Sequence, residues 1–185
     1  CEIPPQRKQV VVSRSFGQEI RDMDTLMATI TEYTSRAAEK LRQEKTCASV
    51  ISVFIQTNPF KKIPQYSNVA SSKLEIPTSY TPRLVDVALG NLKRIFREGY
   101  SYKKSGVILK GITRERELQT GLFYDTANLE KEKRLMDALD RINNDLGRNN
   151  LKPASVLNEM DWQMRSSFRS PRYTTRWEEL PEVSL

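Results

Sequence analysis

Carboxylates are the first candidates for chemistry in this chain, because metal-dependent phosphoryl transfer needs acidic side chains that converge on magnesium. Asp137 and Asp140 stand three residues apart on a predicted helix, but Lys and Arg residues surround them. We therefore interpret the pair as part of a solvated, charged helix face. The chain has no histidine, which excludes Ser-His and Cys-His activation of a nucleophile. We predict no catalytic residue and no metal ligand in this chain.

Short hydroxyls and cations favour a different chemistry, which is contact with phosphate groups. Ser, Arg and Lys side chains bind the DNA backbone, and such contacts carry no sequence information. These residues gather on three predicted strands and on the loop that joins two strands. The candidates are Ser13, Arg14, Ser15, Lys61, Lys62, Ser71, Lys73, Lys103 and Lys104. The alternative is that edge lysines suppress aggregation and that the serines are simply exposed.

The stretch ELQTGLFYD, residues 117–125, places two large apolar side chains in a segment without amphipathic periodicity. Leu122 and Phe123 either fold back onto the neighbouring domain as a small satellite core or fill a pocket on another protein. The residues alone leave both interpretations open.

Aromatic residues alternate with arginines in the last part of the chain, without clean periodicity. The residues concerned are Trp162, Arg165, Arg169, Arg172, Tyr173, Arg176 and Trp177, with Phe168 among them. Such a segment can stack on single-stranded DNA or anchor a protein partner, since aromatics and Arg dominate binding hot spots. A third possibility is that the tryptophans pack on the helix predicted upstream.

The elements that must position these residues follow from periodicity. Alternating or β-branched runs predict strands at 9–16, 47–57, 69–77 and 102–112. Apolar residues at spacings of three and four predict helices at 22–45, with Asp22 or Asp24 as the N-cap, and from Thr81 to Gly99, with Thr81 as the N-cap and Pro82 behind it. The order β-α-β-β-α-β predicts an α+β fold, a four-stranded sheet with both helices on one face and the other face open.

A third helix is predicted from Thr126 to Gly147, with an apolar stripe formed by Leu129, Leu135 or Met136, Leu139, Ile142 and Leu146. It is highly charged elsewhere. The helix either packs on the α+β domain or awaits a partner. We expect the rest of this C-terminal extension to be helical or irregular.

The bulk properties favour a polyanionic partner. Lys and Arg number 30 against 23 for Asp and Glu, a formal net charge of +7. Two cysteines without a CxxC motif indicate a reducing, cytoplasmic compartment. No apolar run approaches the ~20 residues that a membrane-spanning helix needs, so we expect no membrane partner.

Several motifs together resemble the Y-family DNA polymerases, in particular the UmuC-type subunit of polymerase V. These are SRSFG after the first strand, RAAEKLR, TNPF, YSN with AS, the strand KKSGVIL, a downstream Q-x-x-L-F, and WQM followed by SPRYTTRW. The resemblance covers nearly the whole chain. It implies the little-finger domain and C-terminal extension of a translesion polymerase of the SOS response, whose catalytic palm lies upstream and supplies the magnesium site. The opening residues CEIPPQRKQ then read as a linker from that polymerase core.

The resemblance also implies roles for individual residues. The first-strand residues Ser13, Arg14 and Ser15 become the best contacts to primer-template DNA, followed by the lysines. Gln119, Leu122 and Phe123 are similar to the peptide with which bacterial polymerases bind the sliding clamp, although Gly121 departs from the usual polar residue. The arginine- and tryptophan-rich segment becomes a docking site for the processed UmuD-type subunit or for RecA.

The expected organisation is a linker at 1–8, a little-finger domain at 9–115, a clamp-binding linker at 116–125 and a C-terminal extension at 126–185. No cofactor is expected in this part of the protein. The competing hypothesis is a stand-alone protein-interaction module with a split βαβ core and no DNA role.

Overall fold

The computed structural model describes residues 8–117 and 126–145. Within these ranges the elements follow in the order β1 (Gln9–Ile20), α1 (Met23–Gln43), β2 (Thr46–Thr57), β3 (Ser67–Thr78), α2 (Thr81–Ile95), β4 (Tyr102–Arg114), the short 3₁₀ helix η1 (Glu115–Glu117) and α3 (Thr126–Asp145). The predicted β-α-β-β-α-β order is confirmed.

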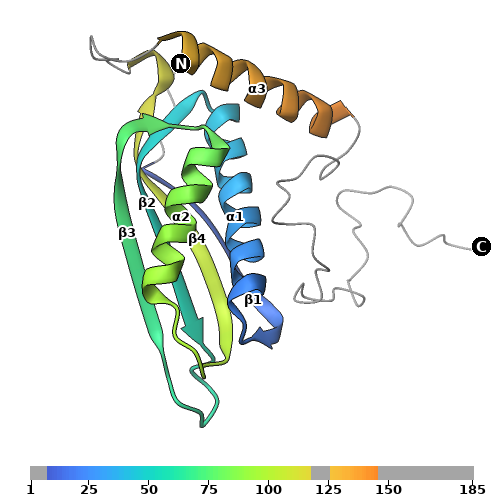
Figure 1. Ribbon diagram of the computed structural model, residues 1–185, viewed down its shortest axis with the longest axis vertical. Helices are drawn as coiled ribbons and strands as arrows, with labels where there is room; N and C mark the ends of the chain where they lie inside the picture. Colours follow the sequence, from blue (N-terminus) through green and yellow to red (C-terminus); the bar gives the residue numbers. More distant parts are fainter. Residues whose placement is uncertain (1–7, 118–125, 146–185) are drawn as a thin grey trace, which may run out of the picture.

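The four strands form one antiparallel sheet in the spatial order β1-β4-β2-β3. Helices α1 and α2 pack side by side on one face of this sheet, and the opposite face carries no helix of the described part of the chain (Figure 1). The predicted α+β architecture is therefore confirmed. Because two helices shield one face only, the strands alternate between buried and more exposed residues.

The core lies between the helices and the sheet. Leu26, Ile30 and Tyr33 of α1 are fully buried there, as are Ile51 and Leu109 of the sheet. The threonines of α1 tolerate burial because their hydroxyls donate to backbone carbonyls one turn earlier, as Thr34 does to the carbonyl of Ile30 at 2.7 Å. Asp22 caps α1 as predicted, and its carboxylate accepts a hydrogen bond from the backbone N–H of Thr25 at 2.7 Å.

Two predicted boundaries were wrong. The first strand does not end at Phe16 but continues to Ile20, because both of these side chains are buried and an irregularity in the pairing with β4 keeps the chain extended between them. The second helix ends at Ile95 rather than running to Gly99, and Phe96 already has extended backbone angles.

The predicted N-cap of α2 was also wrong. Tyr80 occupies the N-cap position without a side-chain cap, and Thr81 is already helical. The hydroxyl of Thr81 instead accepts a hydrogen bond from Arg42 Nη1 at 2.8 Å. This side chain is therefore used to connect α2 to α1.

Candidate nucleic-acid interface

The open face of the sheet is built from four rows of paired residues. Antiparallel pairing places directly opposed residues on the same face, and the registers of the three strand pairs agree. Across β1, β4, β2 and β3 the rows are Gln9–Lys110–Val50–Lys73, Val11–Ile108–Ser52–Ser71, Ser13–Gly106–Phe54–Val69 and Ser15–Lys104–Gln56–Ser67. We call these sixteen residues the open face. None of them is acidic.

Lysines stand at both ends of the open face. Lys104 lies in the last row, while Lys110 and Lys73 lie in the first. Residues 104 and 110 of β4 are six positions apart, which corresponds to about 20 Å along an extended strand. That length matches about six base-pair steps of a duplex at ~3.4 Å per step. Cations at this spacing can reach phosphates at separate positions along a duplex backbone.

The middle of the open face is partly apolar. A Cβ atom added at Gly106 would lie 2.5 Å from the Phe54 ring and 2.5 Å from Ser13 Cβ, so the ring of Phe54 lies across the glycine. Val11 and Val69 are exposed on either side of this centre. The buried Ser52 hydroxyl and the Ser71 hydroxyl share a hydrogen bond of 2.8 Å. The two middle rows of the open face therefore contain hydroxyls and apolar groups but no charged side chain.

Five of the nine predicted DNA contacts lie on the open face. They come from three strands and include hydroxyls and cations: Ser13, Ser15, Ser71, Lys73 and Lys104. Lys61 and Lys62 lie on the loop that joins β2 to β3, next to the row that contains Lys104. The structure therefore places five of these residues on the open face and two on the loop beyond its last row.

Arg14 is not on the open face. Arg14 lies two positions from each of the buried residues Val12 and Phe16, so it shares their side of the edge strand β1, which is the helix-covered side. Burial raises the pKa of the Tyr33 hydroxyl on α1, and the charge of Arg14 opposes that shift. The Arg14 guanidinium therefore lies toward α1 and not on the face that carries Ser13 and Ser15.

Lys103 and Lys61 are both engaged within the protein. Lys103 lies where the pairing of β4 shifts register, and its ammonium group donates to the backbone carbonyls of Phe16 at 2.5 Å and Gly17 at 3.2 Å. Lys61 forms an ion pair with Glu19 at 2.7 Å. These contacts stabilise β1 and the β2–β3 loop, so both lysines have structural partners that sequence reasoning missed.

Lys110 was absent from the predicted contacts although it lies on the open face and is exposed. The signal that could have identified it is the alternation of β4, in which residues 104, 106, 108 and 110 share one side. The contact between Phe54 and Gly106 could not be predicted in this way, because it depends on the pairing of β2 with β4.

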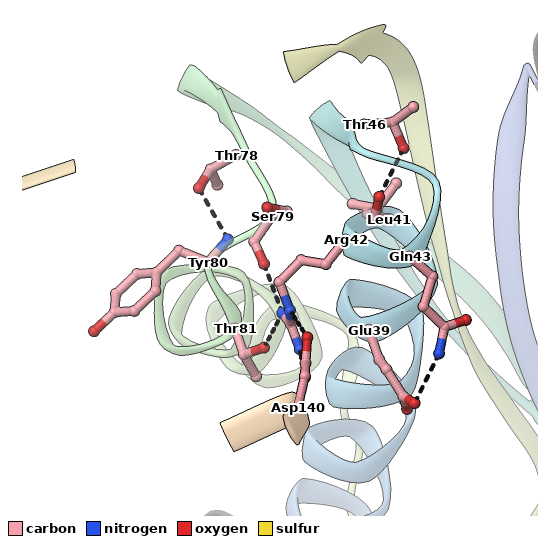
Figure 2. A network of polar contacts seen from close by, with 10 residues as sticks. All are labelled: Glu39, Leu41, Arg42, Gln43, Thr46, Thr78, Ser79, Tyr80, Thr81 and Asp140. Atoms are coloured by element: carbon pink, nitrogen blue, oxygen red, sulfur yellow. Dashed lines mark hydrogen bonds and ion pairs between the residues drawn. The ribbon is translucent and has the colours of Figure 1, made fainter. Parts of the chain in front are cut away.

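A second group of polar residues joins α3 to the domain (Figure 2). Arg42 of α1 donates to both carboxylate oxygens of Asp140, from Nε at 2.6 Å and from Nη2 at 2.7 Å. Its Nη1 donates to the Ser79 carbonyl at 2.9 Å and to the Thr81 hydroxyl. The interpretation of Asp140 as a solvated charge was therefore wrong, because the ion pair leaves only a fifth of its side chain exposed.

Helix α3 lies across the end of the domain where α1 ends and α2 begins (Figure 1). Met136 is its buried apolar contact, and an Arg83–Glu132 ion pair of 2.9 Å adds a further link. Of the predicted stripe, Leu135 and Ile142 are exposed instead. The sequence left two interpretations of this helix open, which were packing on the domain and awaiting a partner. The structure shows packing on the domain.

A cavity of about 900 Å³ remains between α3 and this end of the domain, and Cys47, Tyr80 and Met136 are among its lining residues. Burial raises the pKa of the Cys47 thiol to about 11, although a hydrogen bond with Ser79 lowers it in part. The thiol therefore stays protonated and weakly nucleophilic at neutral pH.

The remaining predicted sites lie outside the described residues. These are the clamp-binding residues Gln119, Leu122 and Phe123, and the partner-binding residues Trp162, Arg165, Arg169, Arg172, Tyr173, Arg176 and Trp177. Within residues 8–117 and 126–145, no three metal-ligating side chains gather. In the same ranges, no helix has the length and apolar character needed to cross a bilayer.

Comparison with known families identifies the domain that carries the open face. Residues 7–122 match the impB/mucB/samB family C-terminal domain. The chain belongs to the impB/mucB/samB family. Residues 133–183 match a second family, a domain of unknown function (DUF4113). The boundary between the two matches lies near the start of α3.

Members of the impB/mucB/samB family resemble the chain over all or nearly all of its length. The ImpB protein of Salmonella typhimurium is 38% identical over 185 residues, and the MucB protein of Escherichia coli is 39% identical over 185 residues. The UmuC protein of Salmonella typhimurium strain LT2 is 36% identical over 183 residues, which is 98% of this chain. In each case the chain spans 43% of the relative's length.

Solved structures show a more distant likeness. One is a complex of the beta-clamp processivity factor with the little finger domain of PolIV, with a TM-score of 0.44 and 15% identity over 63% of this chain and 99% of that one. Another is an insertion ternary complex of Dbh DNA polymerase, with a TM-score of 0.42 and 15% identity over 60% of this chain and 31% of that one.

Proposed function

We propose that this chain grips DNA for an error-prone translesion polymerase of the SOS response and docks that polymerase on its partners. The observation that carries the proposal is the open face, with lysines in its first and last rows and no carboxylate among its sixteen residues. Membership of the impB/mucB/samB family supports it. Catalysis, with its magnesium, belongs in this proposal to the part of the family's length that this chain does not cover.

The mechanism is phosphate neutralisation. Each lysine that binds a phosphate releases a condensed counterion, so the affinity falls steeply as salt rises and does not depend on base sequence. Hydroxyls of the open face, such as those of Ser13 and Ser15, add hydrogen bonds to backbone oxygens. A grip of this kind suits a polymerase that must hold any template, including a damaged one.

The same proposal assigns the docking roles to the segments beyond η1. Gln119, Leu122 and Phe123 bind the sliding clamp, and the segment from Trp162 to Trp177 binds the processed UmuD-type subunit or RecA in the cytoplasm. The resemblance of the Q-x-x-L-F stretch and of the SPRYTTRW ending supports these roles.

The test removes the three lysines of the open face together. We expect Lys73→Gln with Lys104→Gln and Lys110→Gln to weaken binding to a duplex of about 20 base pairs by ten- to a hundredfold at ~0.1 M salt, and to reduce the slope of log K against log salt by about two to three. Fluorescence anisotropy at several salt concentrations measures both quantities.

The matched control removes three exposed lysines from the helices instead. Lys40→Gln, Lys93→Gln and Lys131→Gln cause the same change in net charge but lie on α1, α2 and α3. Equal losses in the two triple variants would show that only net charge matters and would contradict a grip by the open face. Absence of duplex binding by the unaltered chain would favour the stand-alone protein-interaction module.

A further inference from the structure

Phe60 is the most exposed large apolar side chain of the described residues. It lies on the loop that joins β2 to β3, where 95% of its surface is accessible. This loop projects past the end of the sheet (Figure 1). Removing a Phe side chain from water contributes roughly 1.5–3 kcal/mol, so an aromatic left fully in solvent forgoes a large stabilisation.

Hydrogen bonds within the loop connect the residues around Phe60. The backbone N–H of Phe60 donates to the side-chain oxygen of Asn58 at 3.0 Å. Gln65 Nε2 donates to the carbonyls of Asn58 and Lys61, both at 2.9 Å, and to that of Ile63 at 3.2 Å. The two N–H donors of one amide group therefore lie within hydrogen-bond distance of three carbonyls and link the two sides of the loop.

An aromatic cluster lies at the base of the loop, and Phe60 is not part of it. Tyr66 at the base of the loop lies 5.0 Å from the ring of Tyr100 and 6.3 Å from that of Tyr102. The guanidinium of Arg97 lies over the Tyr66 ring at 5.1 Å, and the Tyr66 hydroxyl donates to the Ile95 carbonyl at 2.7 Å. The base of the loop is anchored in the domain while its tip carries an aromatic outward.

The charges around Phe60 favour a nucleic acid over an apolar protein pocket. The loop from Asn58 to Tyr66 contains Lys61 and Lys62 and no acidic residue of its own, although Lys61 forms an ion pair with Glu19 of β1. It follows directly on the last row of the open face, which contains Lys104 and Ser15. An aromatic ring beside cations is the combination that binds single-stranded DNA, where bases stack on the ring and cations follow the backbone.

We propose that Phe60 stacks on an unpaired base of a DNA strand that continues from the duplex held by the open face. This inference rests on the proposed function and adds to it a contact with single-stranded DNA. The hydrogen bonds of the loop lower the entropic cost of the contact, because they restrain the backbone that carries the ring before binding.

The experiment compares two DNA probes with the full chain. One is a blunt duplex, and the other is the same duplex with a short single-stranded extension that carries 2-aminopurine. We expect Phe60→Ala to weaken binding of the extended probe about five- to tenfold, since one base–aromatic stack is worth about that factor or more, and to leave binding of the blunt probe unchanged. Phe60→Trp should retain both the affinity and the quenching of 2-aminopurine, whereas Phe60→Leu should lose them.

Three outcomes would overturn the inference. These are unchanged binding of the extended probe by Phe60→Ala, equal loss on both probes, and full retention by Phe60→Leu, which would indicate a general apolar contact such as a protein pocket. Because the ring contacts solvent, the melting temperatures of all variants should agree with that of the unaltered chain. Failure of the unaltered chain to bind the blunt duplex would instead count against the proposed function itself.

Discussion

Gly106 shapes the open face through the side chain that it lacks. The ring of Phe54 and Cβ of Ser13 both approach it from neighbouring strands. The far end of the ring can turn away from a new methyl group, but Cβ of Ser13 is fixed to the backbone of β1. An alanine at this position must therefore push β1 away from β4.

We predict that Gly106→Ala lowers the free energy of unfolding by about 1–3 kcal/mol, the usual cost of overpacking. The clash should exceed the few tenths to ~1 kcal/mol that Gly→Ala gains by restricting the unfolded chain. Urea unfolding measures the change.

The control for this prediction is Gly90→Ala on α2. An added Cβ there meets nothing within 4 Å, so the higher helix propensity of Ala should raise stability by about 0.5–1 kcal/mol. Stabilisation by both variants would show that the sheet yields easily at Gly106.

Among the secondary-structure elements, Arg42 connects three helices. It lies in the last turn of α1, donates to Thr81 at the start of α2, and forms a bidentate ion pair with Asp140 of α3. Only about 10% of its side chain is exposed, so the loss of Asp140 would leave a partly buried positive charge without its carboxylate. The attachment of α3 to the domain depends on this pair together with Met136.

We predict that Asp140→Asn loosens α3 without unfolding the domain. Hydrogen exchange of α3 amides should speed up, since local opening requires less free energy than global unfolding. The Cys47 thiol lines the cavity beneath α3. With Cys1 replaced by Ser in both proteins, this thiol should react faster with a maleimide in the Asp140→Asn variant than in the protein that keeps Asp140.

Glu130→Gln provides the matched control on the same helix. Its ion pair with Arg134 is largely exposed, and such pairs contribute at most about 0.5 kcal/mol. If Glu130→Gln accelerated the reaction of Cys47 as much as Asp140→Asn, the Arg42–Asp140 pair would not be what holds α3.

In the whole molecule, a weak contact with the sliding clamp and a weak contact with DNA are expected to reinforce each other. A peptide that buries one Leu and one Phe gains roughly 1.5–3 kcal/mol from each, and ordering the peptide offsets part of that gain. Non-specific DNA binding is also weak, with dissociation constants of about 10⁻⁴ to 10⁻⁶ M. When both contacts are on one chain, each raises the effective concentration for the other.

We predict that Leu122→Ala with Phe123→Ala abolishes capture by a sliding clamp and leaves duplex binding unchanged. The affinity of the unaltered chain for clamp loaded on DNA should exceed its affinity for either alone by about a hundredfold. Pull-down with the clamp and anisotropy with DNA measure the two activities separately. Clamp capture that survives the double substitution would exclude this peptide as the anchor.

The sequence by itself determined the order and the faces of the elements. Spacings of three and four, as between Leu26, Ile30 and Tyr33, indicate one side of α1, and these three residues are buried. Alternation along β3 puts Ala70 and Leu74 on one side of the strand, and both are buried as well. These features are local, because periodicity within one helix or strand decides which side chains share a face. The serines and lysines of the open face could be predicted for the same reason.

Only the tertiary structure decided which of these faces meet. The strand order β1-β4-β2-β3 and its registers bring Lys110 and Lys73 into one row. Arg42 and Asp140 are 98 residues apart in sequence, and the shift that turns Lys103 toward backbone carbonyls arises where β4 pairs with its neighbours. Pairing between distant segments depends on the packing of the whole core, and no local period encodes it.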